Sequence, residues 1–232
     1  MKDKTMESLH ARFSAGRTDL IFDLLKLSTV DINDPIGGAS ILQWCAYYGD
    51  VSAMRIALDA GARLDELGED LGLRGAAFHG HWRLCEFLLE RGADVNHRDP
   101  INHESALHAA LCHDDRTKYD LVLRVLLAAG ADVNIATIAN ASTSSFMRDS
   151  RTRAETALHR AAACGTAETV QLLLDAGADR QRRDAFGDSA LAWGSWYRRP
   201  VEVLRLLCFD EYRIHPDYQP LRNNLLGHPL SL

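Results

Sequence analysis

Histidine and cysteine are the residues of this sequence that could do chemistry, and the chain contains ten of the first and five of the second. Imidazole and thiolate are common ligands of zinc, and a thiol held beside an imidazole can act as a nucleophile. Cys112 directly precedes His113, and Cys164 lies five residues after His159. Neighbouring residues of a helix point to different faces, so closeness in sequence alone does not make a nucleophile and its base.

Compact catalytic and metal-binding motifs are missing from the sequence. It contains no Cys-x-x-Cys pair, no Gly-x-Ser-x-Gly, no phosphate-binding Gly-x-x-x-x-Gly-Lys and no His-Glu-x-x-His. We therefore expect a protein that is not an enzyme and that holds neither a metal nor a cofactor. The five cysteines are far apart and odd in number, which favours reduced thiols and a cytoplasmic protein.

The composition indicates a folded, soluble protein. Apolar residues make up 47% of the 232 residues, and 26 basic residues against 32 acidic ones give a net charge of −6. An acidic balance argues against a nucleic-acid binder, which usually needs a basic surface. No stretch of about 18 apolar residues occurs, and the first ten residues lack the apolar run of a signal peptide, so we expect no membrane segment.

A short sequence word recurs along the chain, and leucine is its third residue in every complete copy. Ser105-Ala-Leu-His-Ala-Ala-Leu111 and Thr156-Ala-Leu-His-Arg-Ala-Ala162 are two clear copies. Counted from a degenerate copy near the N-terminus, the register leucines are separated by 33, 31, 34, 51 and 33 residues, a period typical of repeat architectures. These leucines are Leu9, Leu42, Leu73, Leu107, Leu158 and Leu191.

The second half of each unit carries a signal in the same register. An apolar pair is followed three residues later by Gly-Ala, as at Gly92 and Gly177, where a glycine suits a left-handed helix end. Together with Gly80-His81 and Gly92-Ala-Asp-Val-Asn96, this pattern resembles the ankyrin repeat family over roughly residues 7 to 210. The sequence departs from the family in lacking the proline that usually follows the threonine.

The resemblance implies an all-α ankyrin-repeat solenoid of stacked helix pairs with projecting β-turns. It also implies that His81, His108 and His159 are structural residues that hydrogen-bond within and between turns. We expect one domain over residues 1–232, with a long inserted loop in the turn region after the third full repeat. The predicted parts are an N-terminal capping repeat (1–33), three repeats (34–66, 67–98 and 99–134), the inserted loop (135–153), a fourth repeat (154–183), a C-terminal repeat (184–210) and a tail (211–232).

Aromatic residues are frequent where the family exposes the end of its first helix on a concave surface. Such side chains are enriched at binding hot spots because they bury much area for little loss of rotamer entropy. Some of them could instead pack under neighbouring turns. The predicted partner-binding residues are Trp44, Tyr47, Tyr48, Phe78, His79, Cys112, His113, Cys164, Trp193, Trp196 and Tyr197, together with Arg148, Arg151 and Arg153 of the inserted loop.

Basic residues gather in the second half of the sequence. Residues 1–116 carry a net charge of −7 and residues 117–232 a net charge of +1. The arginines of the loop and later turns therefore suggest a partner with an acidic patch, although a charged face can also serve solubility alone. The inserted loop is likewise either a tolerated surface loop or a finger that contacts the partner.

We therefore predict a monomeric, non-catalytic protein–protein interaction module, a scaffold, adaptor or inhibitor, that binds neither nucleic acid nor membrane. A second hypothesis is a small-molecule binder or an enzyme that uses His79, Cys112, His113 and Cys164 in the groove. A deep pocket with strongly shifted pKa values would favour this hypothesis. His79 and His113 occupy one position in adjacent repeats, so a metal site built from this pair is a further hypothesis.

Overall fold

The computed structural model describes residues 2–27, 31–113, 116–143, 151–210 and 212. Within these ranges the regular structure is helical, with isolated β-bridges in the turns and no β-strand, which confirms the all-α prediction. The chain divides into two compact units, Met1–Asp94 and Val95–Leu232, which we describe one at a time. The expected single domain and its repeat boundaries stay predictions. None of the described helices is long and apolar enough to cross a membrane.

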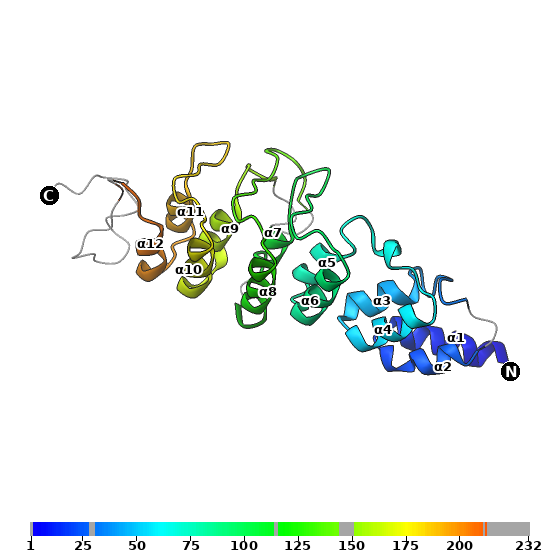
Figure 1. The fold of residues 1–232 in the computed structure, drawn as a ribbon. Coiled ribbons are helices and arrows are strands. Elements are labelled where there is room, and N and C mark those ends of the chain that lie inside the picture. Colours follow the sequence, from blue (N-terminus) through cyan, green and yellow to red (C-terminus); the bar gives the residue numbers. More distant parts are fainter. Residues whose placement is uncertain (1, 28–30, 114–115, 144–150, 211, 213–232) are drawn as a thin grey trace. The chain divides into compact units, whose positions relative to one another are not determined.

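The first unit consists of helical hairpins that pack on one another (Figure 1). The first helix of each hairpin is here called the inner helix and the second the outer helix. The outer helices of the three hairpins contact one another in order, and the inner helices of the last two hairpins contact each other. The elements are α1 (Lys2–Ser14), the 3-10 helix η1 (Thr18–Leu20), α2 (Ile21–Leu25), α3 (Ile41–Tyr48), α4 (Val51–Asp59), the 3-10 helix η2 (Leu64–Leu67), α5 (Leu73–Phe78) and α6 (Trp82–Glu90).

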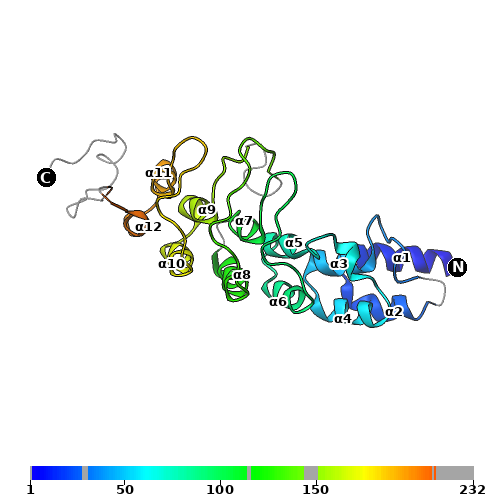
Figure 2. The same ribbon diagram turned by 45° about the horizontal axis from the view of Figure 1, so that its top comes forward.

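The second unit repeats this arrangement (Figure 2). Inner helix α9 packs between α7 and α11, and outer helix α10 packs between α8 and α12. The register predicted from sequence therefore corresponds to helix pairs that stack inner on inner and outer on outer. The elements are α7 (Ala106–Ala110), α8 (Arg116–Ala128), α9 (Ala157–Cys164), α10 (Ala167–Asp175), α11 (Ala190–Trp196) and α12 (Val201–Leu207).

The first residue of the recurring word begins most inner helices because it caps their exposed N–H groups. Ser40 Oγ accepts the N–H of Gln43 at 3.2 Å, and Gln43 Oε1 accepts the N–H of Ser40 at 2.9 Å. In α9, Nδ1 of His159 accepts the N–H of Thr156 at 3.2 Å, and its Nε2 donates to the carbonyl oxygen of Asp188 in the next turn at 3.2 Å. The structural role expected of this histidine is thus confirmed.

Register leucines and small residues form the core of the inner helices. Leu42, Leu107 and Leu158 are almost fully buried. Small residues let neighbouring helices approach closely, and a Cβ added to Gly194 of α11 would lie 2.9 Å from the side chain of Leu204 in α12. The alanines and glycines of the recurring word are therefore a packing requirement of the stack.

Asparagine side chains fasten consecutive turns to one another. In the first unit, Asn33 Nδ2 donates to the carbonyl oxygen of Gly61 at 3.4 Å, and its Oδ1 accepts the N–H of Arg63 at 3.2 Å. Asn96 and Asn134 make the same pair of contacts with the next turns of the second unit, at 2.7–3.2 Å. We call this arrangement the asparagine clasp. It needs an amide, because a carboxylate can accept but not donate.

Gly49 ends α3 in the left-handed conformation, with φ of 71°, and a Cβ at this position would lie 2.6 Å from the ring of His81. We expect Gly49→Ala to lower the free energy of unfolding by about 2 kcal/mol, since it strains the backbone and displaces the ring. Gly61→Ala is the matched control, because Gly61 has φ of 98° but no atom near its missing Cβ. Urea unfolding of both variants measures the difference, and equal losses would contradict the role of the His81 contact.

The two ends of the predicted inserted loop, residues 135–143 and 151–153, lie among the described residues, whereas 144–150 lie outside them. The ends pair with each other, since the N–H of Asn140 donates to the carbonyl oxygen of Thr152 at 2.7 Å. They also pair sideways with the turns on either side. These sideways hydrogen bonds run from the Ile138 N–H to the Asn102 carbonyl oxygen at 2.8 Å and from the Ala185 N–H to the Arg153 carbonyl oxygen at 2.7 Å.

Candidate partner-binding surface

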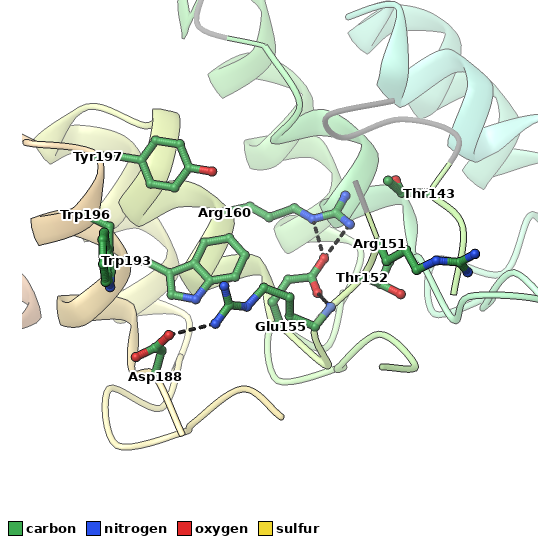
Figure 3. A pocket seen from close by; sticks show the side chains of 10 residues that line it. Thr143, Arg151, Thr152, Glu155, Arg160, Asp188, Trp193, Trp196 and Tyr197 are labelled. Atoms are coloured by element: carbon green, nitrogen blue, oxygen red, sulfur yellow. Dashed lines mark hydrogen bonds and ion pairs between the residues drawn. The ribbon is translucent and has the colours of Figure 1, made fainter. Parts of the chain in front are cut away.

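A cavity of about 390 Å³, here called the α11 cavity, lies between the end of α11 and the ends of the inserted loop, within the second unit (Figure 3). Aromatic side chains of α11 stand on one side of it, and the loop residues Thr143, Arg151 and Thr152 stand on the other. The remaining lining residues are Arg153, Glu155, Arg160, Asp188, Trp193, Trp196 and Tyr197.

Three aromatic residues of the predicted partner-binding set border this cavity. Trp196 is the last residue of α11 and is 78% exposed, and the adjacent Tyr197 is 40% exposed. Trp193 lies one turn earlier and is only 6% exposed, because its Nε1 donates to Asp184 Oδ2 at 3.0 Å and its ring meets His159 edge-on at 5.5 Å. Trp193 thus packs within the repeat, the alternative left open for some of these aromatic residues, and it also lines the cavity.

One wall of the cavity is backed by a buried arginine and two buried glutamates. Arg160 Nη2 lies 2.6 Å from Oε1 of Glu104 and 2.6 Å from Oε1 of Glu155, and all three side chains are almost completely buried. The hydroxyl of Thr143 donates to Glu104 at 2.6 Å, and that of Thr137 donates to Glu155 at 2.7 Å. We call the three charged residues the Arg160 cluster. It ties the inserted loop to the helices that flank it.

The charge state of this cluster follows from its contacts. Burial alone would raise the pKa of Glu155, but the charge of Arg160 and hydrogen bonds from Arg153 and Thr137 outweigh burial and hold that pKa below its usual value. The nearby His108 stays neutral, because burial and then the charge of Arg160 lower its pKa to about 4. An ionised Glu155 and a neutral His108 therefore lie beside the guanidinium of Arg160.

A second arginine beside the cavity is also held by two carboxylates. Arg153 Nε lies 2.7 Å from Asp184 Oδ2, and its Nη2 lies 2.7 Å from Asp188 Oδ2. Its guanidinium stacks on the ring of Phe186, 4.4 Å from the centroid, and lies 5.6 Å from the ring of Trp193. We call Arg153, Asp184 and Asp188 the Arg153 cluster. The positive charge expected to face a partner here is already matched within the chain.

The other loop arginines offer different contacts. Arg151 is exposed, and its Nη1 donates to the carbonyl oxygen of Asn140 at 2.9 Å. Arg148 lies outside the described residues. Among the described loop arginines, Arg151 therefore has the guanidinium that solvent reaches most readily.

The predicted contact residues of the first unit form a cluster of rings on α3 and α5. Tyr47 is 52% exposed and meets the rings of Tyr48 and His79 edge-on at 5.0 and 4.9 Å. Phe78 meets His79 edge-on at 5.2 Å. The Tyr48 hydroxyl and the Trp44 Nε1 each donate to a backbone carbonyl oxygen, at 2.8 and 2.6 Å. Tyr47 is thus the member of the cluster that offers most of its ring to a partner.

The cysteines and histidines of the second hypothesis are held by local contacts. The thiols of Cys112 and Cys164 each donate to a backbone carbonyl oxygen at 3.1 Å, and burial raises the pKa of Cys164 to about 11. His113 stacks on Tyr119 with ring centroids 4.9 Å apart, and His79 belongs to the first unit. Within the described parts of the chain, no group of three or more histidine, cysteine or acidic residues could hold a metal ion.

Sequence reasoning did not single out Glu104, Glu155, Arg160 or Asp188. A signal was nevertheless present, because a glutamate directly precedes the recurring word in only two copies, Glu-Ser-Ala-Leu-His from Glu104 and Glu-Thr-Ala-Leu-His from Glu155. The second of these words also carries an arginine directly after its histidine, at Arg160. A charged residue in a position that the stack buries needs a partner of opposite charge, and two glutamates in register supply it.

Sequence comparisons agree with the repeated helix pairs. Three models of ankyrin repeats match the chain, at residues 73–117, 102–138 and 138–219. Similar proteins include the ankyrin repeat domain-containing protein SAT10 of Stachybotrys chartarum, with 28% identity over 200 residues (86% of this chain and 9% of that protein). The mitochondrial disaggregase of Bos taurus is 30% identical over 165 residues (62% and 23%).

A third relative, the serine/threonine-protein kinase TNNI3K of Mus musculus, is 40% identical over 55 residues, which are 22% of this chain and 7% of the kinase. The chain therefore spans less than a quarter of each of these three relatives. What the similar proteins share with it is the repeat region. From the family matches and the stacked helix pairs, the chain belongs to the ankyrin repeat family.

Proposed function

We propose that this chain is a non-catalytic protein-binding module whose second unit holds a segment of a partner protein in the α11 cavity. Ankyrin repeats are in general protein–protein interaction modules and are generally not catalytic. The observation that carries the proposal is Trp196, a large indole that is 78% exposed at the edge of a cavity. Exposed aromatic surface beside a cavity is typical of a binding site, where a partner covers that surface.

The proposal extends to three further surfaces. The first is the ring cluster of the first unit, where Tyr47 is the most exposed residue. The second is the tips of the turns, where Ile101 and Phe186 are 70% and 71% exposed. The third is the inserted loop with Arg151, which would meet an acidic group of the partner. The module is proposed to act as a monomer in the cytoplasm, which suits its free cysteines.

Small-molecule binding is a second candidate function, and the size of the α11 cavity favours it. Ligand pockets usually enclose about 300–1,000 Å³ and combine apolar walls with a few polar groups. The cavity of about 390 Å³ is at the lower end of that range and joins aromatic walls to charged groups. A compound that competes with the partner for this cavity would show that both candidates use one site.

Trp196→Ala is expected to weaken binding of the partner by about tenfold to a hundredfold, as truncation of an aromatic hot spot does. It should leave the free energy of unfolding within about 0.5 kcal/mol of the wild type, because the side chain is mostly in water. Affinity capture from the source cell identifies proteins that the wild type retains and the variant loses, and titration of the purified partner then gives both dissociation constants.

Phe22→Ala is the matched control for this experiment. Phe22 is also an exposed aromatic residue, at 58%, but it lies on the outer helix α2. The control should retain the same proteins as the wild type. Retention of those proteins by the Trp196 variant with unchanged affinity would contradict the proposed function.

A further inference from the structure

We infer that the α11 cavity receives an arginine side chain of the partner, whose guanidinium stacks on Trp196 and pairs with Asp188. The inference rests on the proposed function and specifies its chemistry. It differs from the acidic partner that the arginine-rich sequence of this region suggests. The inference depends on the pairing of the arginines around the cavity, on the one accessible carboxylate of their clusters, and on a guanidinium that the chain already holds in the same way.

Two of the arginines that line the cavity have their charge matched within the chain. The Arg160 cluster and the Arg153 cluster each combine one guanidinium with two carboxylates. The lining holds Arg151, Arg153 and Arg160 together with Glu155 and Asp188, and the buried Asp184 and Glu104 pair with Arg153 and Arg160 from behind it. Because Arg153 and Arg160 already pair with carboxylates of the chain, they attract an anionic group of a partner only weakly, and an accessible carboxylate among them would select a cationic group.

Asp188 is the carboxylate of these clusters that a partner can reach. Its side chain is 32% exposed, whereas those of Asp184, Glu104 and Glu155 are 0%, 0% and 2% exposed. A carboxylate has about four acceptor positions on its two oxygens, and the ion pair with Arg153 occupies one of them through Oδ2. Asp188 can therefore accept a further N–H donor from the cavity.

Trp196 supplies the surface on which a guanidinium would stack. Figure 3 shows Trp196, Trp193 and Tyr197 on the same side of the cavity as Asp188. A cation over the face of an indole gains electrostatic energy from the ring, and tryptophan gives the strongest such contact. The indole of Trp196 is mostly in water, so an arriving side chain would bury it without first displacing a packed group.

Arg153 gives an internal example of the same recognition. Its guanidinium is stacked on an aromatic ring at 4.4 Å while two aspartates accept its N–H groups at 2.7 Å. Arginine suits this geometry better than lysine, because its planar head stacks on a ring and presents several donors in one plane. A partner arginine between Trp196 and Asp188 would make the same two kinds of contact, one with an aromatic ring and one with an aspartate.

Binding of short peptides tests the inference directly on the full chain. The probe is Ac-Gly-Gly-Arg-Gly-Gly-NH2, and its matched analogue carries citrulline, which has the same shape without the charge. We expect the arginine peptide to shift the indole N–H resonance of Trp196 and the citrulline peptide to bind about tenfold more weakly. Added salt should weaken the arginine peptide and leave the citrulline peptide unchanged.

Two variants and one control locate the binding. Trp196→Ala and Asp188→Asn should each weaken the arginine peptide by about tenfold. Phe22→Ala removes an exposed ring of the outer helix α2 and should leave binding unchanged. Equal affinity of the two peptides, tighter binding of a glutamate peptide, or wild-type affinity in both variants would each overturn the inference.

The inference and the proposed function can fail separately. A captured partner that depends on Trp196, but keeps its affinity when the arginines of its bound segment are changed to glutamine, overturns the inference and leaves the function standing. A capture experiment in which no protein depends on Trp196 contradicts the function, whatever the peptides do.

Discussion

Replacing Arg160 with methionine is expected to lower the free energy of unfolding by about 3–5 kcal/mol, the largest effect of any substitution considered. The reason is the burial of the Arg160 cluster. Arg160 Nη2 lies 2.6 Å from a carboxylate oxygen of Glu104 and 2.6 Å from one of Glu155, away from water. Methionine fills much of the same volume but leaves two facing carboxylates without their cation. Urea unfolding of the full chain, followed by circular dichroism, measures the loss.

Arg124→Met is the matched control. Arg124 Nη2 is also 2.6 Å from a glutamate oxygen, that of Glu168, but the two side chains are 51% and 67% exposed. An exposed ion pair contributes about 0–1 kcal/mol because water solvates both charges, so this variant should lose little stability. Equal losses in the two variants would contradict the special role of burial.

Removing the carboxylates as well should recover part of the lost stability. In a variant that combines Arg160→Met with Glu104→Gln and Glu155→Gln, no charge of the Arg160 cluster remains, and the amides can still accept hydrogen bonds from the loop threonines. A recovery of stability would identify the uncompensated charges as the cause of the loss, whereas a further loss of stability would assign it to the packing of the replaced side chains.

The stability of the chain is expected to fall as the pH is lowered from about 6.5 toward 4, by about 3 kcal/mol through His108 alone. Burial, and then the charge of Arg160, lower the pKa of His108 from 6.5 to about 4. Between these two values the unfolded chain binds a proton that the folded chain does not, so protons favour unfolding. The contribution is complete above pH 6.5 and is lost as the pH falls through this range.

The hydrogen bonds of His108 give the geometric reason. Nδ1 accepts the N–H of Ser105 at 3.2 Å, and Nε2 donates to the carbonyl oxygen of Glu155 at 3.2 Å. The neutral ring with its proton on Nε2 satisfies both contacts. Protonation of Nδ1 would set one N–H donor against another, so the folded state resists the second proton.

His108→Gln tests this prediction with little change in structure. In the first unit, Gln43 stands at the same register position; its Oε1 accepts the N–H of Ser40, and its Nε2 donates to the carbonyl oxygen of Glu66 at 3.1 Å. Glutamine can therefore replace both bonds of the imidazole without a titratable group. Urea unfolding at several pH values from 7 to 4.5 should give a flatter dependence for the variant than for the wild type.

If the free energy of unfolding of the glutamine variant depended on pH as steeply as that of the wild type, the pH dependence would come from groups other than His108. His159 shifts in the same direction, because burial lowers its pKa too. The carboxylates Glu155 and Asp184, whose pKa values are lowered, lose their contribution at a more acidic pH, below about 4.5. The range between pH 6.5 and 4.5 therefore reports on the histidines.

The helices and their order could be predicted from the sequence because capping residues and register leucines mark the helices within each repeat. Ser40 and Thr156 cap the inner helices, and leucines such as Leu158 fill the same position in every copy. These signals are local, since a cap or a register leucine acts within one helix and its immediate neighbour. The structural role of His159 followed in the same way.

The α11 cavity and its charges could not be predicted in this way. Glu104 and Arg160 are 56 residues apart, and their contact depends on how the inserted loop and two turns pack together. Trp193 shows the same limit, because the carboxylate of Asp184 that accepts its indole N–H lies in the preceding turn. Which arginines of the basic region are neutralised by a carboxylate depends on how the folded chain brings the two together. The spacing of residues in the sequence does not show these pairs.

The asparagine clasps have a consequence for how the array unfolds. Each clasp makes one turn depend on the next, so loss of a repeat also removes two hydrogen bonds from its neighbour. Asp65 occupies the clasp position between the hairpins α3–α4 and α5–α6, and its carboxylate instead pairs with Arg63 of its own turn at 2.8 Å. A carboxylate cannot donate to the carbonyl oxygen of the next turn. We therefore expect the folding of the hairpins α3–α4 and α5–α6 to be coupled less strongly than that of the hairpins joined by Asn33, so that the first unit would open first at this boundary.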